Sequence, residues 1–177
     1  SGDIDNRIGK GAQKEAMQEG SRMHRKIQGR MGMEYRAEVP LKLEVPQEQY
    51  VLALEGRADG IITNVDGVTV DEIKCMYTDV TRFEEPIFVH KAQAMCYAYI
   101  YALQNGLDQI SVQLTYCDLD TEEICRFEEA FSFFWLERWF QDMMEAYRKW
   151  TDFQFAWRKI RQTSIQTLEF PFPYREG

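Results

Sequence analysis

Two extended runs joined by a tight turn constrain this chain more than any other feature of its sequence. Residues 50–63 read YVLALEGRADGIIT and residues 68–74 read VTVDEIK, and both runs are rich in the residues that favour strands. Between them, Asn64-Val65-Asp66-Gly67 is typical of a hairpin turn. Residues 38–45 alternate apolar and polar side chains, and Pro40 places this run near a sheet edge. The three runs together predict an antiparallel meander.

Helical and extended patterns share the remainder of the chain. Residues 13–30 predict a helix. Gly20 inside it costs about 1 kcal/mol relative to Ala, so we expect glycine to be required there by packing or by the close approach of another group. The later elements are a helix over residues 86–102 that Asn105-Gly106 ends, strands over 110–116 and 123–127, and a helix over 128–159. This order predicts a mixed α/β domain with a central sheet.

Composition narrows the class of protein. The 177 residues suffice for one domain with a real core, and 45% apolar and 28% charged residues are ordinary for a globular protein. We find neither an apolar run long enough to cross a bilayer nor a secretion signal, and we therefore expect no membrane partner and a cytoplasmic location. The net charge of −8 argues against a protein that coats nucleic acid, but acidic residues that bind a metal would contribute to it.

The cysteines do not predict a metal centre. Cys75, Cys96, Cys117 and Cys125 are widely spread, and no C-x-x-C pair occurs. We expect most of them to be small buried hydrophobic residues.

Acidic and basic residues flank the hairpin turn. If residues 61–63 and 68–70 are neighbouring arms, Asp59 and Glu72 lie close together. Glu72 and Lys74 are two residues apart and share one face of the strand, while Ile73 points into the core. Two carboxylates supply the oxygen ligands that Mg²⁺ or Mn²⁺ prefers, and we expect the Ile73 carbonyl as a further ligand. A lysine beside the metal can orient an attacking water and stabilise negative charge.

Each of these residues also has a structural interpretation. Asp59 can be a turn aspartate next to a glycine, and Glu72 with Lys74 can be a solvated pair on one strand face. His24 lies on a basic helix surface, where a solvent-exposed histidine and a metal ligand are equally good interpretations.

The helix over residues 86–102 carries a polar stripe. His90, Gln93 and Tyr97 are spaced so that they fall on one helical face, and an amide such as Gln93 on an otherwise apolar helix requires a polar partner. The aromatic series from Phe131 to Trp157 can stack nucleic-acid bases, but we interpret it as core or as an interface to a neighbouring domain.

Four short motifs, in this order and on the expected elements, carry a family resemblance. They are Glu19-Gly20-x-x-x-His24, Gly56-x-x-Asp59-x-Ile61, Glu72-x-Lys74 and Gln93-x-x-x-Tyr97. The chain in this respect resembles the PD-(D/E)XK nuclease superfamily, and within it the RecB-like branch that includes the CRISPR adaptation exonucleases. The resemblance implies a restriction-endonuclease-like α/β fold, a central mixed sheet flanked by helices. It also implies that Asp59, Glu72 and His24 bind metal, that Lys74 assists the water, and that Gln93 and Tyr97 sit beside the active centre.

The expected function follows from this resemblance. We expect a Mg²⁺- or Mn²⁺-dependent deoxyribonuclease, an exonuclease acting on single-stranded DNA or DNA ends in repair or recombination. The alternative is a catalytically inactive nuclease-fold module that binds or docks on DNA. Members of the branch with an iron–sulfur cluster place one cysteine before the nuclease core and three near the C-terminus, and this sequence lacks that pattern, so we expect no cluster.

The end of the sequence suggests a larger protein. Residues 168–177, LEFPFPYREG, resemble the entry to the ATPase core of XPD/DinG-type helicases, although an ordinary C-terminal strand is an alternative. We therefore expect a nuclease-like domain over residues 1–167 and, from 168, the start of a following helicase domain.

Overall fold

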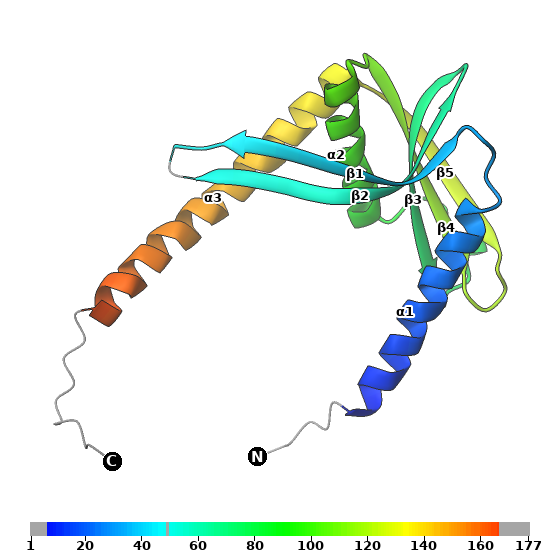
Figure 1. Cartoon of the computed structure of the whole chain (residues 1–177), viewed down its shortest axis with the longest axis horizontal. Coiled ribbons are helices and arrows are strands. Elements are labelled where there is room, and N and C mark those ends of the chain that lie inside the picture. The colour runs from blue at the N-terminus through cyan, green and yellow to red at the C-terminus, as the bar shows by residue number, and fades with distance from the viewer. Residues whose placement is uncertain (1–6, 49, 167–177) are drawn as a thin grey trace. The chain divides into compact units, whose positions relative to one another are not determined.

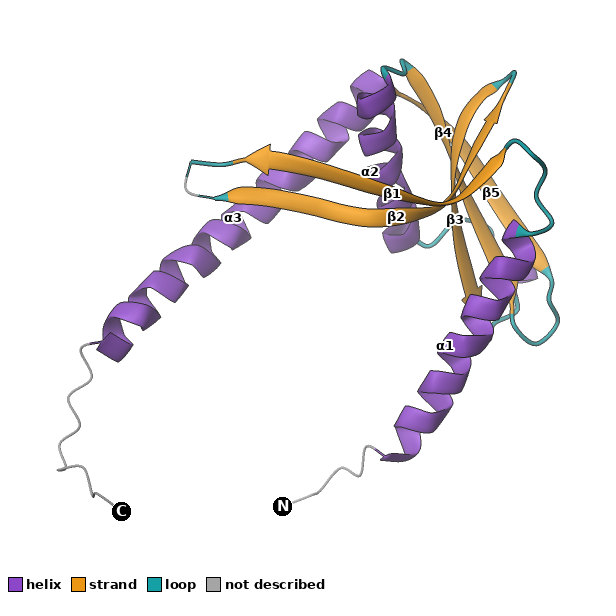
Figure 2. Ribbon diagram, viewed as in Figure 1, coloured by secondary structure: helices purple, strands orange, loops and turns teal. Residues whose placement is uncertain are grey.

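A five-stranded mixed sheet flanked by helices organises the chain, as the mixed α/β prediction required. The computed structural model describes residues 7–48 and 50–166, and the strands follow one another in the order β1-β2-β3-β4-β5 across the sheet (Figures 1 and 2). The elements are α1 (Arg7–Gln28), β1 (Tyr35–Pro46), β2 (Val51–Asn64), β3 (Gly67–Met76), the 3₁₀ turn η1 (Val80–Arg82), α2 (Phe88–Asn105), β4 (Gln109–Asp118), β5 (Ile124–Ser132) and α3 (Phe133–Gln166).

The predicted antiparallel meander of β1, β2 and β3 is confirmed. Its turn has the expected chemistry, because the Asn64 side-chain oxygen accepts the backbone N–H groups of Asp66 at 3.0 Å and Gly67 at 3.1 Å. Gly67 adopts a φ of +136°, which a side chain would disfavour. β1 forms an edge of the sheet, where Pro40 can lack an N–H without leaving a central ladder incomplete.

A change of direction occurs between β3 and β4, which pair in parallel, whereas β4 and β5 are antiparallel. Parallel neighbours need a long crossover connection, and α2 provides it. The helix ends as the sequence predicts, because Gly106 adopts the left-handed conformation with φ 63° and the Leu107 N–H bonds back to the Ala102 carbonyl at 3.0 Å.

Helices α1 and α2 cover opposite faces of the sheet (Figure 2). On the α1 face, Met23 and Ile27 pack with Ile73 and Cys117. The next residue along β3, Lys74, points to the other face and reaches α2. A Cβ built on Gly20 would meet nothing within 4 Å in the described part of the chain, so the expectation that packing or a close approach requires glycine there is wrong.

The last helix starts later than its sequence pattern suggested. Residues 128–132 belong to β5, because Phe131 pairs with Ile110 and Ser132 with Gln109, so the prediction of a helix from residue 128 is wrong. The chain divides into two units, Ser1–Glu137 and Arg138–Gly177, and the described part of the second unit is helical. Phe140 in this unit is buried, but Trp150 and Trp157 are exposed at 55% and 58%, which excludes the core interpretation for these two residues.

The structure bears only in part on the expectations about the membrane and about a following domain. No helix in the described range is both long and apolar enough to cross a bilayer. The segment at residues 168–177, expected to begin a helicase domain, lies outside the described residues.

Candidate active site

The site starts where β2 and β3 part. Their antiparallel pairing ends at Gly60 and Asp71, which leaves Asp59 and Glu72, the next residues on each strand, outside the ladder. The Asp59 carboxylate takes over the role of the missing strand, because its Oδ2 accepts the Ile73 N–H at 2.7 Å. Since the N–H and C=O of one strand residue point to the same side, the Ile73 carbonyl is directed toward the same edge.

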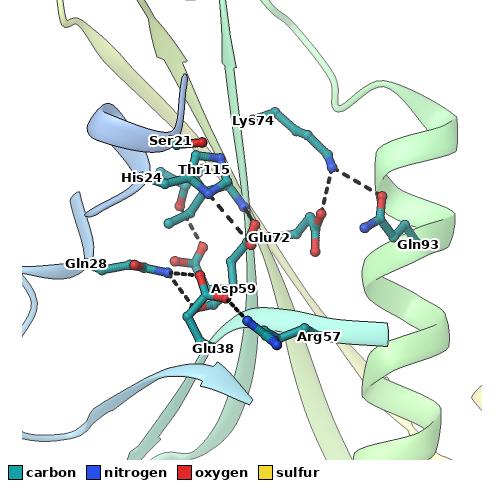
Figure 3. A network of polar contacts seen from close by, with 12 residues as sticks. Ser21, His24, Gln28, Glu38, Arg57, Asp59, Glu72, Lys74, Gln93 and Thr115 are labelled. Carbon is teal, nitrogen blue, oxygen red and sulfur yellow. Dashed lines mark hydrogen bonds and ion pairs between the residues drawn. The ribbon is translucent and has the colours of Figure 1, made fainter. Parts of the chain in front are cut away.

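Glu72 and Lys74 project from one face of β3, as their spacing predicted (Figure 3). The Lys74 ammonium donates to Glu72 Oε1 at 2.7 Å. Glu72 is only 2% exposed, and its second oxygen, Oε2, is buried with no hydrogen-bond partner among the described residues. Ile73 lies between them in sequence, fully buried on the opposite face.

Helix α2 supplies the residues on one side of Lys74 (Figure 3). The Gln93 side-chain oxygen accepts a hydrogen bond from Lys74 at 3.2 Å, and its amide nitrogen donates to the Tyr97 hydroxyl at 3.4 Å. Gln93 thus has the polar partner that its place on an apolar helix required. Tyr97 in turn lies against β2, where a Cβ on Gly56 would come within 2.6 Å of its hydroxyl. Glycine at position 56 is what makes room for this ring.

Helix α1 approaches from the other side. His24 Nδ1 lies 3.7 Å from Asp59 Oδ1, and the Gln28 amide donates to the Asp59 backbone carbonyl at 2.9 Å. The structure therefore brings together all of the residues that the sequence singled out: His24, Asp59, Glu72, Ile73, Lys74, Gln93 and Tyr97.

Burial and mutual repulsion disfavour the charged forms of both carboxylates. Burial, and then the negative charge of Asp59, raise the pKa of Glu72 to about 7 despite the hydrogen bond from Lys74. Burial also raises the pKa of Asp59, against the opposing effects of the Ile73 N–H and of the His24 and Lys74 charges. A cation beside the two carboxylates would favour their charged forms.

The donor set suits a hard divalent cation. Asp59 and Glu72 offer carboxylate oxygens, one of them without another partner, and the Ile73 carbonyl and His24 lie next to them. Among the described residues, however, no three His, Cys, Asp or Glu side chains already form a set that could hold a metal ion. A cation would therefore have to complete its shell with the backbone carbonyl and water.

Sequence reasoning missed Glu38, which lies opposite Asp59. In the β1–β2 register, Ala37 pairs with Gly60 and Val39 with Ala58, so Glu38 is unpaired, and it adopts a left-handed φ of 56°. Its carboxylate accepts from Gln28 at 3.1 Å and from Arg57 at 3.3 Å. The register continues unchanged on both sides of Glu38, and nothing in the regular alternation of residues 38–45 signals this interruption of the pairing.

A second polar cluster, also missed, lies on the α1 face. Asp71 is fully buried, and it accepts hydrogen bonds from Thr115 at 2.7 Å, Gln113 at 2.9 Å and the Tyr35 hydroxyl at 3.2 Å. The Tyr35 ring reaches it across Gly60, where a Cβ would stand 1.9 Å from a ring carbon. This cluster fastens β1, β3 and β4 together beneath the site.

Comparison with known proteins adds little. No family model matches the chain, and no curated protein matches it. Among solved structures, the chain is similar to a crystal structure of SSO0001, with 21% identity and a TM-score of 0.47. The match covers 72% of this chain and 58% of that one, so the chain spans less than two thirds of SSO0001. The sheet and helices of the chain itself establish its class, a mixed α/β fold.

Proposed function

We propose that this chain is a metal-dependent deoxyribonuclease in which Asp59 and Glu72 hold a Mg²⁺ or Mn²⁺ ion and Lys74 assists the attacking water. The observation that carries the proposal is the buried, unpartnered Oε2 of Glu72 next to a second carboxylate. Burying a carboxylate oxygen without a partner is costly, and two adjacent carboxylates increase that cost. A divalent cation offsets both costs at once.

A salt bridge alone explains the arrangement less well. Lys74 neutralises one oxygen of Glu72, but it leaves Oε2 and the whole charge of Asp59 without a cation in direct contact. His24 offers Asp59 only a 3.7 Å approach. The site has one lysine and one distant histidine for two carboxylates, which favours a site built to receive a further positive charge.

The residues around the carboxylates suit hydrolysis of a phosphodiester. A bound divalent cation would supply a more acidic water and would neutralise the charge that develops on the phosphate. Gln93 holds the Lys74 ammonium from one side and Glu72 holds it from the other, so it is fixed before substrate arrives. An ammonium fixed in this way can orient the water and stabilise developing negative charge on a phosphate oxygen.

The finer assignment rests on the sequence motifs. The four motifs that resemble the RecB-like branch of the PD-(D/E)XK nucleases contribute the residues that meet at the site. We propose on this ground a restriction-endonuclease-like arrangement and exonuclease action on DNA ends or single strands, in the setting of repair or recombination.

Metal binding and cleavage test the proposal separately. Titration calorimetry with Mn²⁺ should show binding to the wild type that Asp59→Asn or Glu72→Gln abolishes. The exposed Glu44 provides the matched control, and Glu44→Gln should bind like the wild type. Labelled single- and double-stranded DNA should be cut with Mn²⁺ and left intact with a chelator.

Lys74 separates rate from metal affinity. Lys74→Ala should keep Mn²⁺ binding and lower the cleavage rate by about 100-fold, the scale for losing one preorganised charged group. Lys149→Ala, at an exposed position on α3, is the control and should cut at the wild-type rate. If the wild type binds Mn²⁺ and DNA but leaves the DNA intact, the chain is a DNA-docking module and not an enzyme. Unchanged Mn²⁺ binding in both carboxylate variants would remove the site assignment.

A further inference from the structure

His90 lies beside the proposed site but has no part in the mechanism given above. It occupies the first turn of α2, one turn before Gln93, the residue that holds Lys74. His90, Gln93 and Tyr97 fall on one face of the helix. The positive charge of Lys74 is close enough to contribute to lowering the pKa of His90. His90 as a whole residue is half-buried.

Tyr116 fixes the position of this imidazole. Tyr116 pairs with Lys74 in the parallel register of β3 and β4, so both side chains leave the sheet side by side on the α2 face. The tyrosine is fully buried, with Phe83 and Phe127 packed edge-on against its ring at centroid distances of 5.1 Å and 6.0 Å. Its hydroxyl lies 3.2 Å from His90 Nδ1. A rigid ring next to Lys74 thus holds His90 in place.

The hydrogen bonds of the hydroxyl favour one tautomer of His90. The Tyr116 oxygen already accepts the Ile87 N–H at 2.9 Å, and its own proton is available to the Nδ1 of His90. Burial, and then the charge of Lys74, lower the pKa of His90, which favours a neutral ring at neutral pH. A neutral imidazole that accepts at Nδ1 carries its proton on Nε2. The nitrogen that Tyr116 does not occupy is therefore a hydrogen-bond donor.

We propose that His90 binds substrate phosphate: its Nε2–H donates to a non-bridging oxygen of a phosphodiester adjacent to the one cut beside Glu72 and Lys74. This inference rests on the proposed nuclease function. A neutral donor at this place contacts an anionic strand without adding a second charge next to Lys74. It also sets where the strand lies along α2, and so which bond reaches the carboxylates.

Oligonucleotides with single methylphosphonate substitutions test the contact, because this change removes the charge and one non-bridging oxygen at a chosen phosphate. Binding is measured by fluorescence anisotropy in the Glu72→Gln background, so that no cleavage is needed. One position next to the scissile phosphate should bind about tenfold more weakly, the scale for a hydrogen bond to a charged group. His90→Ala should weaken binding of the unmodified strand by a similar factor and should show no further loss at that position.

Three variants guard against a purely structural effect. His90→Gln keeps a side-chain N–H donor and should retain part of the affinity, whereas Val89→Ala, its exposed neighbour on α2, should bind like the background protein. Tyr116→Phe removes the proton that sets the tautomer and should reduce the same positional effect. The proposal would be overturned if the loss of affinity from His90→Ala added fully to the loss from a methylphosphonate at every position. It would also be overturned if neither change weakened binding.

A cleavage assay on the wild type distinguishes failure of the His90 assignment from failure of the nuclease function. If the wild type cuts DNA but the binding cycle shows no coupling at His90, only the histidine assignment fails. If the wild type cuts nothing with any divalent cation while the coupling is present, the nuclease function fails and His90 remains a phosphate ligand. A protein that binds no oligonucleotide would overturn both.

Discussion

At the scale of single residues, the candidate site combines several arrangements that do not favour folding by themselves. Glu72 is buried beside Asp59 with one oxygen unpartnered, and Glu38 holds a backbone conformation that non-glycine residues rarely adopt. Such departures are concentrated at functional sites, where the rest of the fold supports them. Each of them has a measurable effect on stability.

Glu72 should make the metal-free protein less stable as the pH rises. Its pKa of about 7 in the folded state lies above the ordinary value of 4.5, so between these values the folded protein keeps a proton that the unfolded chain releases. Stability is therefore highest below pH 4.5 as far as this group is concerned, and it falls as the pH approaches 7. Glu72→Gln should remove this fall and raise the free energy of unfolding at pH 8 by about 3 kcal/mol.

Urea unfolding over a pH series in the presence of a chelator measures this effect. The variant and the wild type should have similar stability near pH 4, should diverge between pH 4.5 and about pH 7, and should keep a constant difference above that. Glu44→Gln, an exposed glutamate on β1, should follow the wild type at every pH. Parallel profiles for Glu72→Gln and the wild type would contradict the raised pKa.

The variant Glu38→Gly should be more stable than the variant Glu38→Ala. Both substitutions remove the hydrogen bonds from Gln28 and Arg57, and only glycine is free of strain at a φ of 56°. The difference in unfolding free energy should be about 1 kcal/mol in favour of Glu38→Gly. Thermal or urea unfolding of the two variants measures it, and an alanine variant at least as stable as the glycine variant would count against the strain.

At the scale of secondary-structure elements, the fit of α2 against β2 depends on one absent side chain. A Cβ at position 56 would come within 2.6 Å of the Tyr97 hydroxyl and 2.7 Å of a ring carbon, so Gly56→Ala should push the ring away from the strand. We expect a loss of about 1–3 kcal/mol, the usual cost of overpacking. Tyr97→Ala removes the obstacle, so the double variant should lose clearly less than the sum of the two single losses. Strict additivity in urea unfolding would show that the two residues do not interact.

The sequence predicted those elements whose signals are local. The Asn64–Gly67 turn set the β2–β3 hairpin, and the spacing of two residues set the shared face of Glu72 and Lys74. The left-handed backbone of Glu38 was not predictable, because this position lies opposite Asp59 across the strands and nothing near it in sequence signals it. The strand character of residues 128–132 likewise comes from pairing with β4, which overrides their local preference.

At the scale of the whole molecule, the net charge of −8 affects how strongly the chain can bind a polyanion such as DNA. Asp59 and Glu72 face the proposed path of the phosphate, so without metal they should repel DNA. The double variant Asp59→Asn/Glu72→Gln should therefore bind DNA more tightly than the wild type in a chelator, by roughly tenfold for two charges removed near a phosphate.

A change of charge elsewhere provides the control for this prediction. Glu44→Gln/Glu55→Gln removes the same total charge from exposed positions on β1 and β2 and should change the affinity little.

Adding Ca²⁺ should strengthen DNA binding by the wild type but not by the Asp59/Glu72 double variant. Anisotropy titrations at one fixed ionic strength measure all three proteins, and equal gains for both double variants would mean that net charge, and not the site, governs affinity.

The parallel pairing of β3 with β4 affects the order in which the site forms during folding. The β2–β3 hairpin can bring Asp59 and Glu72 together early, because only a short turn separates its arms. Gln93 joins them only after α2 has crossed over and β4 has docked beside β3, a non-local step that is slow because a long loop must close first. Until then the two carboxylates remain hydrated on an open hairpin, with Lys74 unsupported. On the proposed function, a chain still emerging from the ribosome would be unable to cut nucleic acid around it, and cleavage would begin only once the domain is complete.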